Sequence, residues 1–188
     1  MSENLDVKTP FTGDASADAL LTQNSLALML GMLLDQQVPM EWAFSAPATL
    51  QERLGRPLDA TSIAAMPEEQ FEALFREKPA LHRYPGSMAK RAHALCVFLV
   101  EHYDGRPEGL WRDAADGNEL LARVKALPGF GNDKARIFVG LLGKRMGVRP
   151  TGWEQAAADW PSIADVDTFE RVAEIRAAKR AKKRASTT

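Results

Sequence analysis

The sequence is 188 residues long and has one cysteine, three histidines and a formal net charge of only −1. A single thiol, at Cys96, cannot form an internal disulfide, and it cannot supply the ligands of a zinc finger or of a cysteine-held iron–sulfur cluster. No apolar run is long enough to span a bilayer, and the N-terminus does not resemble a signal peptide. We therefore expect a soluble, cytoplasmic protein without a metal site or other cofactor.

The low net charge conceals two basic segments on an acidic remainder. Residues 169–188 contain seven Lys or Arg and two Glu, a formal charge of +5, and residues 131–149 have a formal charge of +4. Basic segments of this kind favour a polyanionic partner, although solvated helix faces have the same composition. The charge pattern alone leaves both interpretations open.

Apolar residues recur with helical spacing along most of the chain, and no segment sustains the period of two that is typical of a strand. Three long stripes lie at 26–34, 88–103 and 135–146, and Thr22 is the expected N-cap of the first. Shorter helices are expected at 47–54, 67–76, 117–126 and 168–183, with Pro or Gly in the gaps. The sequence therefore predicts an all-α fold, with unstructured ends at 1–10 and 185–188.

The most informative segment, residues 127–135, lies between two expected helices and reads Leu-Pro-Gly-Phe-Gly-Asn-Asp-Lys-Ala. Gly129 and Gly131 allow positive φ and a close backbone approach, and Pro128 ends the preceding helix. The free amides that begin the next helix favour an anion such as phosphate, and Lys134 and Arg136 add positive charge. The segment predicts an anion-binding hairpin, although a plain joint between two helices would also use Gly and Pro.

This segment resembles the helix–hairpin–helix motif of the DNA glycosylase superfamily (HhH-GPD). Residues 33–38 (Leu-Leu-Asp-Gln-Gln-Val) resemble the Gln-Gln segment that the 3-methyladenine glycosylase-like branch, which lacks an iron–sulfur cluster, places beside a flipped base. Residues 89–92 (Ala-Lys-Arg-Ala) resemble the helix that precedes the hairpin in that branch. The resemblance implies that the hairpin binds DNA through Leu127, Gly129, Phe130, Gly131, Lys134 and Arg136.

The resemblance also implies a two-lobed helical bundle with double-stranded DNA bound in the cleft. One unit, residues 1–188, would contain a central lobe at about 40–147 and a second lobe formed by about 11–39 and 148–184. An extruded base needs a stacking wall and polar groups that read its edge. Gln36, Gln37, Trp42 and Trp153 are the residues expected to line this pocket, although aromatic residues such as Trp42 could equally belong to the core.

The expected catalytic residue is missing. Family glycosylases carry an Asp just beyond the second hairpin helix, and this chain has the uncharged Thr151 there. Asp167, in a Val-Asp-Thr sequence similar to the family's, could replace it if the intervening residues loop out. Asp35 could also replace it, since it lies beside the Gln pair at a helix end where a negative charge is disfavoured. A hydrogen-bonding or capping role for Asp35 remains open.

The resemblance implies a base-excision repair enzyme that hydrolyses the N-glycosidic bond of a damaged base. Bifunctional members use a Lys two residues after the last hairpin Gly, where this chain has Asp133, so a monofunctional enzyme is expected. The replacement by Thr151 keeps open a non-catalytic relative that only binds DNA or senses lesions, and a helical protein–protein adaptor is a third alternative. The expected location is the cytoplasm, with nucleoid association in a bacterium.

Overall fold

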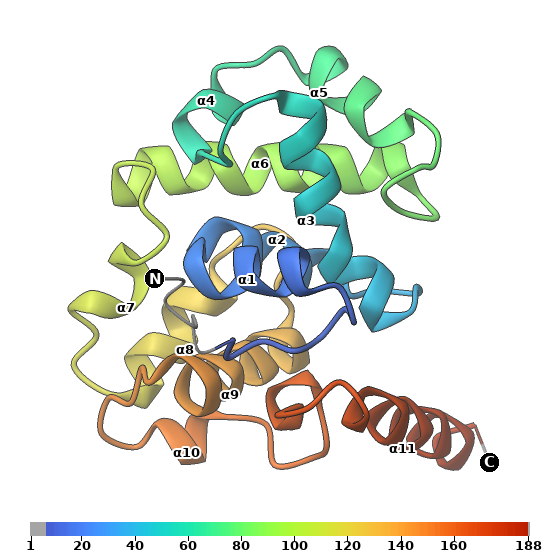
Figure 1. Ribbon diagram of the computed structural model, residues 1–188. Helices are drawn as coiled ribbons and strands as arrows, with labels where there is room; N and C mark the ends of the chain where they lie inside the picture. Colours follow the sequence, from blue (N-terminus) through green and yellow to red (C-terminus); the bar gives the residue numbers. More distant parts are fainter. Residues whose placement is uncertain (1–6, 188) are drawn as a thin grey trace, which may run out of the picture.

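The computed structural model describes residues 7–187, and all regular secondary structure in this range is helical (Figure 1). The prediction of an all-α fold is therefore confirmed. The helices are α1 (Ala15–Gln23), α2 (Ser25–Leu34), α3 (Met40–Leu54), α4 (Ala60–Ala64), α5 (Glu68–Arg76), α6 (Pro85–Tyr103), α7 (Gly109–Arg112), α8 (Gly117–Lys125), α9 (Asn132–Met146), α10 (Trp153–Ala156), the 3₁₀ helix η1 (Ile163–Asp165) and α11 (Arg171–Ala185).

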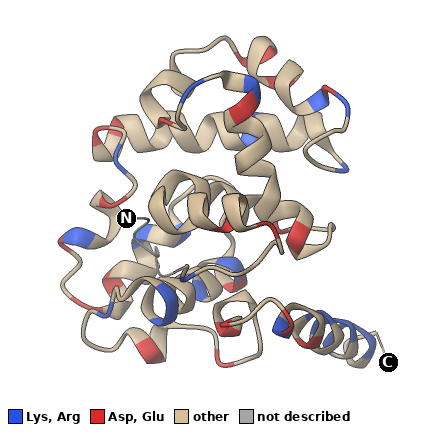
Figure 2. Ribbon diagram, in the orientation of Figure 1, with Lys and Arg blue, Asp and Glu red and all other residues tan. Residues whose placement is uncertain are grey.

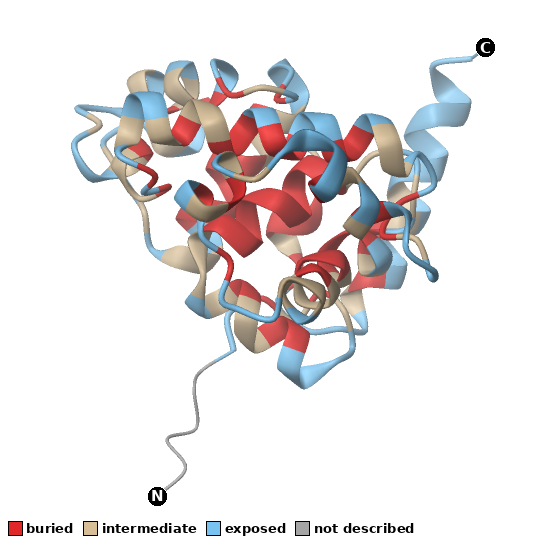
Figure 3. Cartoon of the chain, turned by 90° about the horizontal axis from the view of Figure 1, so that it is seen from above, coloured by how far each residue is buried: buried red, intermediate tan, exposed pale blue. Residues whose placement is uncertain are grey.

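Helix α2 is the central element of the fold. Every residue from Leu26 to Leu34 is buried, and the corresponding ribbon lies in the buried interior of the molecule (Figure 3). A helix that is apolar on all sides must be enclosed by other elements, and α1 and α3 pack directly against it. Its N-cap is Asn24, whose side chain accepts from the Ala27 amide at 3.0 Å, so the expected cap at Thr22 was wrong.

Two helix boundaries differ from the sequence-based expectations. Helix α3 begins at Met40 and includes Pro47, where a helix start was predicted. Proline removes one helical hydrogen bond, but the seven residues before it continue the buried face through Ala43 and Phe44. Helix α11 begins at Arg171 without a side-chain cap, three residues after the expected start at 168.

The helices pack in two groups. Helices α3 to α6 pack together, and α8, α9, α10 and η1 form a second group, with α1 and α2 between them in Figure 1. Within the second group, α10 and η1 follow α9 in the chain and pack against it. One continuous core of buried residues joins both groups.

The N-terminal segment is held in place from the first described residues onward. Thr9 is fully buried, and its hydroxyl donates to the Asp18 main-chain oxygen at 2.9 Å. Asp18 in turn accepts from the amides of Phe11 and Thr12, and burial raises the pKa of its carboxyl despite these bonds. The expectation that residues 1–10 are unstructured is thus wrong at Thr9, and residues 1–6 lie outside the described part of the chain.

Helix α11 extends from the second group and carries most of its Lys and Arg residues along an exposed surface (Figure 2). Val172 and Ile175 are its buried residues. Arg176 forms an ion pair with Glu41 of α3, and the C-terminal half is exposed from Ala177 onward except at Ala178. The basic segment found in the sequence is therefore a helix whose first turns are anchored by buried residues and whose later turns are largely solvent-exposed.

Within residues 7–187, no single helix is long and apolar enough to cross a membrane, although α1 and α2 taken together pass this test with a bend of 112°. In the same range, no cluster of three His, Cys, Asp or Glu side chains is placed to hold a metal ion. Cys96 is buried, and burial raises the pKa of its thiol to about 12. A thiol that stays protonated is a packing residue rather than a nucleophile.

Candidate functional site

The hairpin between α8 and α9 is built by two buried side chains and two exposed glycines. Leu127 and Phe130 are buried, and the Phe130 ring packs edge-on against Phe138 with a centroid distance of 5.7 Å. These side chains fix the loop, so any contact that they make with DNA must come from the backbone. Gly129 has φ +83°, a conformation in which a residue with a side chain is strained.

The exposed edge of the hairpin offers free main-chain donors. Gly131 is the N-cap of α9, and no side chain caps this helix. A Cβ at Gly131 would meet no atom within 4 Å, so the approach to the helix start is open. The first amides of any helix lack helical acceptors, and the positive end of the helix dipole adds to their attraction for an anion. The geometry therefore suits a phosphate group.

The hairpin rests directly on the C-terminal end of α2. A Cβ at Gly129 would lie 2.4 Å from Leu33 Cδ1, so a glycine is required for this close packing. Lys134 Nζ donates to the Leu33 main-chain oxygen at 2.7 Å. This places the lysine, which was expected to contact phosphate, between the hairpin helix and α2. Burial lowers the pKa of its ammonium to about 8, and the nearby charge of Asp35 opposes this shift.

Asp35 occupies the C-cap of α2 and is almost enclosed. Its side chain is only 5% exposed, and Lys179 Nζ of α11 lies 3.1 Å from its Oδ2 atom. A carboxylate at a helix C-terminus is unfavourable by itself, but here the ammonium groups of Lys179 and Lys134 compensate for it. The structure thus brings a buried carboxylate, a hairpin lysine and a lysine of the basic helix to one point.

The turn that follows Asp35 is held by His82 and Arg91, neither of which the sequence singled out as a site residue. His82 Nε2 lies 3.1 Å from the Leu34 oxygen and 3.0 Å from the Gln36 oxygen, and its Nδ1 accepts from the Tyr84 amide. These partners require a proton on Nε2 and none on Nδ1. Burial lowers the pKa of His82, which keeps the ring in this neutral form.

The two glutamines present different groups. Arg91 Nη1 donates to Gln36 Oε1 at 3.2 Å, so this amide has a fixed orientation. Gln37 is exposed and has φ +58°, a strained conformation for a residue that is not glycine. The Gln36 amide is therefore held against the protein by Arg91, whereas the Gln37 side chain is exposed to solvent.

An aromatic wall stands beside this turn. The Trp42 ring stacks on His82 with a centroid distance of 6.3 Å and an interplanar angle of 28°, and its 39% exposure leaves much of the indole accessible. The Tyr84 ring lies 6.1 Å from the same histidine ring. Phe44, in contrast, is fully buried against Phe11 in the core. Trp42 and Tyr84 are thus the rings available to stack on a ligand near Gln36 and Gln37.

A family model for HhH-GPD superfamily base excision DNA repair proteins matches residues 30–187. The chain belongs to this superfamily. The match includes the C-terminal half of α2, the hairpin and α11, so the residues of the site lie within the family region. Searches of curated proteins and of solved structures found no match.

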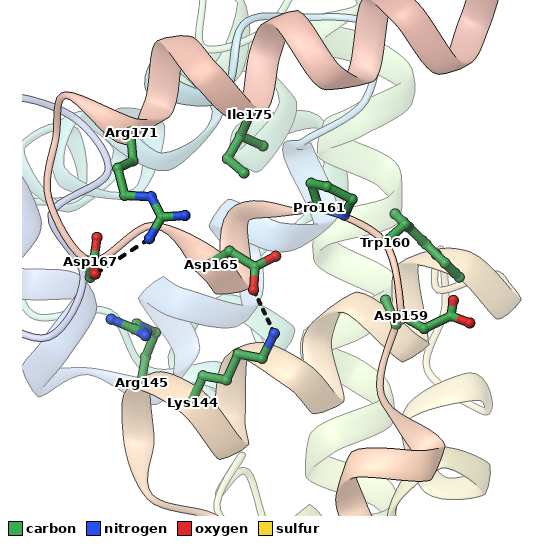
Figure 4. Close-up of a pocket in the computed structure, with 10 residues that line it drawn as sticks. Lys144, Arg145, Asp159, Trp160, Pro161, Asp165, Asp167, Arg171 and Ile175 are labelled. Atoms are coloured by element: carbon green, nitrogen blue, oxygen red, sulfur yellow. Dashed lines mark hydrogen bonds and ion pairs between the residues drawn. The ribbon is translucent and has the colours of Figure 1, made fainter. Parts of the chain in front are cut away.

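Membership of the HhH-GPD superfamily makes the position of Asp167 important. Its side chain is 50% exposed and pairs with Arg171 at 3.5 Å. The neighbouring Asp165 binds Lys144 at 2.5 Å (Figure 4), ten residues along α9 from Lys134, which is about 15 Å on a helix. The structure therefore does not bring Asp167 to the hairpin, and Thr151 is exposed with no charge to contribute.

Trp153 also lies away from the Gln36–Gln37 turn. Its ring covers Gly143, where a Cβ would lie 2.2 Å from the indole, and Arg149 stacks over it at 5.9 Å. It therefore packs on the C-terminal half of α9, and the structure does not bring it together with Gln36. Arg136 faces a different tryptophan, with its guanidinium 5.0 Å from the Trp160 ring and one nitrogen donating to the Ala157 oxygen.

Proposed function

We propose that this base excision DNA repair protein is a monofunctional DNA glycosylase that uses Asp35 to hydrolyse the N-glycosidic bond of a damaged base in double-stranded DNA. The observation that carries this proposal is the place of the Asp35 carboxylate. It is enclosed beside Gln36, faces Lys179 and lies next to the Lys134 ammonium at the base of the hairpin. The Gln36–Gln37 turn supports membership of the 3-methyladenine glycosylase-like branch.

The binding step would use the hairpin. A DNA phosphate would accept from the free amides at the start of α9, where Gly131 leaves the approach open. The neighbouring nucleotide would rotate out of the duplex toward the turn at the end of α2. Its base would stack on Trp42, whose ring is accessible, and the amides of Gln36 and Gln37 would read its polar edge.

The chemical step would use the negative charge of Asp35. As the bond between the deoxyribose C1′ and the base nitrogen breaks, positive charge develops on the sugar, and a nearby carboxylate stabilises it. Water then forms a bond to C1′ and gives a proton to the carboxylate, which passes it to the departing base. Lys179 would release Asp35 at this stage, since its own side chain is 40% exposed and can move to a DNA phosphate.

The environment of Lys134 supports hydrolysis rather than attack by an amine. Its Nζ already donates to the Leu33 oxygen, and a pKa of about 8 leaves most of the amine protonated at neutral pH. A protonated, hydrogen-bonded ammonium is a poor nucleophile. We therefore expect base release without cleavage of the DNA strand.

Single-turnover base release from duplexes containing uracil, hypoxanthine, alkylated purines or 8-oxoguanine tests the proposal. The Asp35→Asn substitution should reduce release by at least about a hundredfold, while duplex binding is retained. Asp167→Asn is the matched control and should release the base at nearly the wild-type rate, because Asp167 lies away from the hairpin. Duplex binding without release from any of these substrates would instead indicate a non-catalytic, lesion-sensing protein.

A further inference from the structure

A second binding site lies beside the hairpin, between the loop that precedes η1 and helix α11. It is a groove of about 380 Å³ that opens at Asp133 in the first turn of α9. Its lining combines apolar side chains with three lysines of α11. The residues that line it are Trp160, Pro161, Ala178, Lys179, Lys182 and Lys183, together with Asp133 and Ser186.

Two cationic side chains contact the Trp160 ring at this groove. Arg136 Cζ lies 5.0 Å and Lys182 Nζ lies 4.2 Å from the ring centroid. Arg136 is itself fixed by a 2.8 Å bond to the Ala157 oxygen. Trp160 also lines the neighbouring polar pocket, where its side chain points away from the Lys144–Asp165 pair (Figure 4). Arg136 thus holds the ring in place from α9.

The composition of the groove identifies the class of ligand. Lys182 and Lys183 give an attraction for phosphate groups, whereas Lys179 is paired with Asp35, and a flat, half-exposed indole gives a stacking platform. A nucleic-acid base exposes its face for stacking only when it is unpaired or extruded. Lysines along an aromatic platform are therefore the combination that binds single-stranded nucleic acid without sequence preference.

We propose that this groove binds an unpaired nucleotide next to the duplex phosphate that the hairpin holds, with its base on Trp160 and its phosphate on Lys182 and Lys183. Lys182 would then move from the ring to the phosphate. The proposal rests on DNA binding at the hairpin but not on catalysis by Asp35. The protein should consequently prefer a duplex with a single-stranded extension over a blunt duplex.

Fluorescence anisotropy with four probes tests this inference. The probes are a blunt duplex, the same duplex with a four-nucleotide thymidine extension at the 5′ or the 3′ end, and a duplex with an abasic extension of equal length at the favoured end. The abasic extension supplies the same phosphates without bases. We expect one thymidine extension to bind at least about fivefold more tightly than its abasic counterpart, as for one base stacked on an aromatic side chain.

Substitutions at the platform provide the second part of the test. Trp160→Ala should remove the difference between the thymidine and abasic extensions, and Trp160→Phe should retain most of it. The ratio of affinities for the thymidine and abasic extensions is measured within each variant. A partial loss of folding lowers both affinities equally and therefore cancels in this ratio. Lys182→Gln with Lys183→Gln should weaken both extensions, whereas Lys78→Gln, on the distant loop after α5, should change neither.

Two results would overturn the proposal: equal binding of the thymidine and abasic extensions by the wild-type protein, or an undiminished difference in Trp160→Ala. The outcome is independent of glycosylase activity. Base release without a preference for the extension would refute this site alone. A preference for the extension without base release would refute the proposed catalysis alone.

Discussion

The ammonium of Lys179 lies 3.1 Å from Oδ2 of Asp35, and this contact joins residues 144 positions apart in the chain. It connects the basic helix α11 to the end of the central helix α2. The Asp35 side chain is only 5% exposed, while that of Lys179 is 40% exposed. Loss of the pair would therefore leave the carboxylate poorly solvated, whereas water could solvate the ammonium. The pair therefore controls both the stability of this corner and access to the candidate catalytic group.

Lys179→Gln should lower the free energy of unfolding by about 1 kcal/mol, because it leaves a nearly buried carboxylate with weaker compensation. The remaining charge of Lys134 and the exposure of Lys179 keep the loss below the value for a fully buried pair. Urea denaturation at neutral pH measures this change. Lys183→Gln is the matched control, since no ion pair of Lys183 is found in the described part of the chain, and it should change stability by less than about 0.5 kcal/mol. Equal effects of the two substitutions would show that Asp35 does not need its partner.

The two hairpin glycines should respond differently to substitution. Gly129→Ala introduces a Cβ 2.4 Å from Leu33 Cδ1 at a positive φ, and it should reduce stability by about 1–3 kcal/mol. Gly131→Val meets no neighbouring atom and has φ −73°, so it should cost less than about 1 kcal/mol.

Gly131→Val should nevertheless weaken the binding of duplexes of every sequence, because its side chain covers the free amides of α9. Thermal unfolding and duplex titration of both variants separate the two effects. Normal DNA binding by a folded Gly131→Val protein would mean that the hairpin is only a connector.

Alkaline pH should stabilise the fold through Lys134. Burial lowers the pKa of this lysine from its usual 10.5 to about 8, so the unfolded chain binds more protons than the folded protein between these values. Stability due to this group therefore rises with pH from about 8 to about 10.5 and is lost as the pH falls through 8.

The difference in unfolding free energy between the wild-type protein and Lys134→Met measures this contribution, and it should shift in favour of the wild type as the pH rises from about 8 to about 10. Cys96 acts in the opposite direction, because its raised pKa of about 12 makes the unfolded chain ionise first. Both proteins contain Cys96, so its effect cancels. A difference that does not change with pH would contradict the buried position of Lys134.

The exposed end of α11 should contribute to the salt dependence of DNA binding. Arg180 and Lys183 lie side by side on this surface. Their double substitution to Gln should reduce the slope of log affinity against log salt by up to about 1.8, which corresponds to two phosphates. Arg56→Gln with Lys78→Gln, which removes the same charge from the α3–α6 group, is the control and should leave the slope unchanged. An unaltered slope in the Arg180 and Lys183 variant would remove α11 from the interface.

The sequence was informative where local chemistry decides the structure. The order of Pro128, Gly129 and Gly131 predicts a break between two helices, and the structure has that break. The continuous apolar residues of α2 likewise predict a buried helix. Such features depend on neighbours within a few positions, and periodicity and turn preferences report them directly.

The composition of the site could not be predicted in the same way. His82 and Lys179 meet the end of α2 only after the chain has folded back over 46 and 144 residues, and no spacing in the sequence encodes these contacts. The contacts of Trp153 could not be predicted for a related reason. Its sequence position after the hairpin is compatible with packing at either end of α9. The absence of a side chain at Gly143 leaves room for the Trp153 ring at the C-terminal end.

Helix α11 also determines how its own DNA contacts would appear in a titration. Asp35 and Glu41 neutralise Lys179 and Arg176 in the free protein, so they act as counterions that belong to the chain itself. When a DNA phosphate replaces one of these carboxylates, the DNA releases a bound cation. The carboxylate that loses its partner must then be compensated by another cation. The salt slope would then understate the number of phosphates bound, and the same exchange would uncover Asp35 at the moment when the substrate arrives.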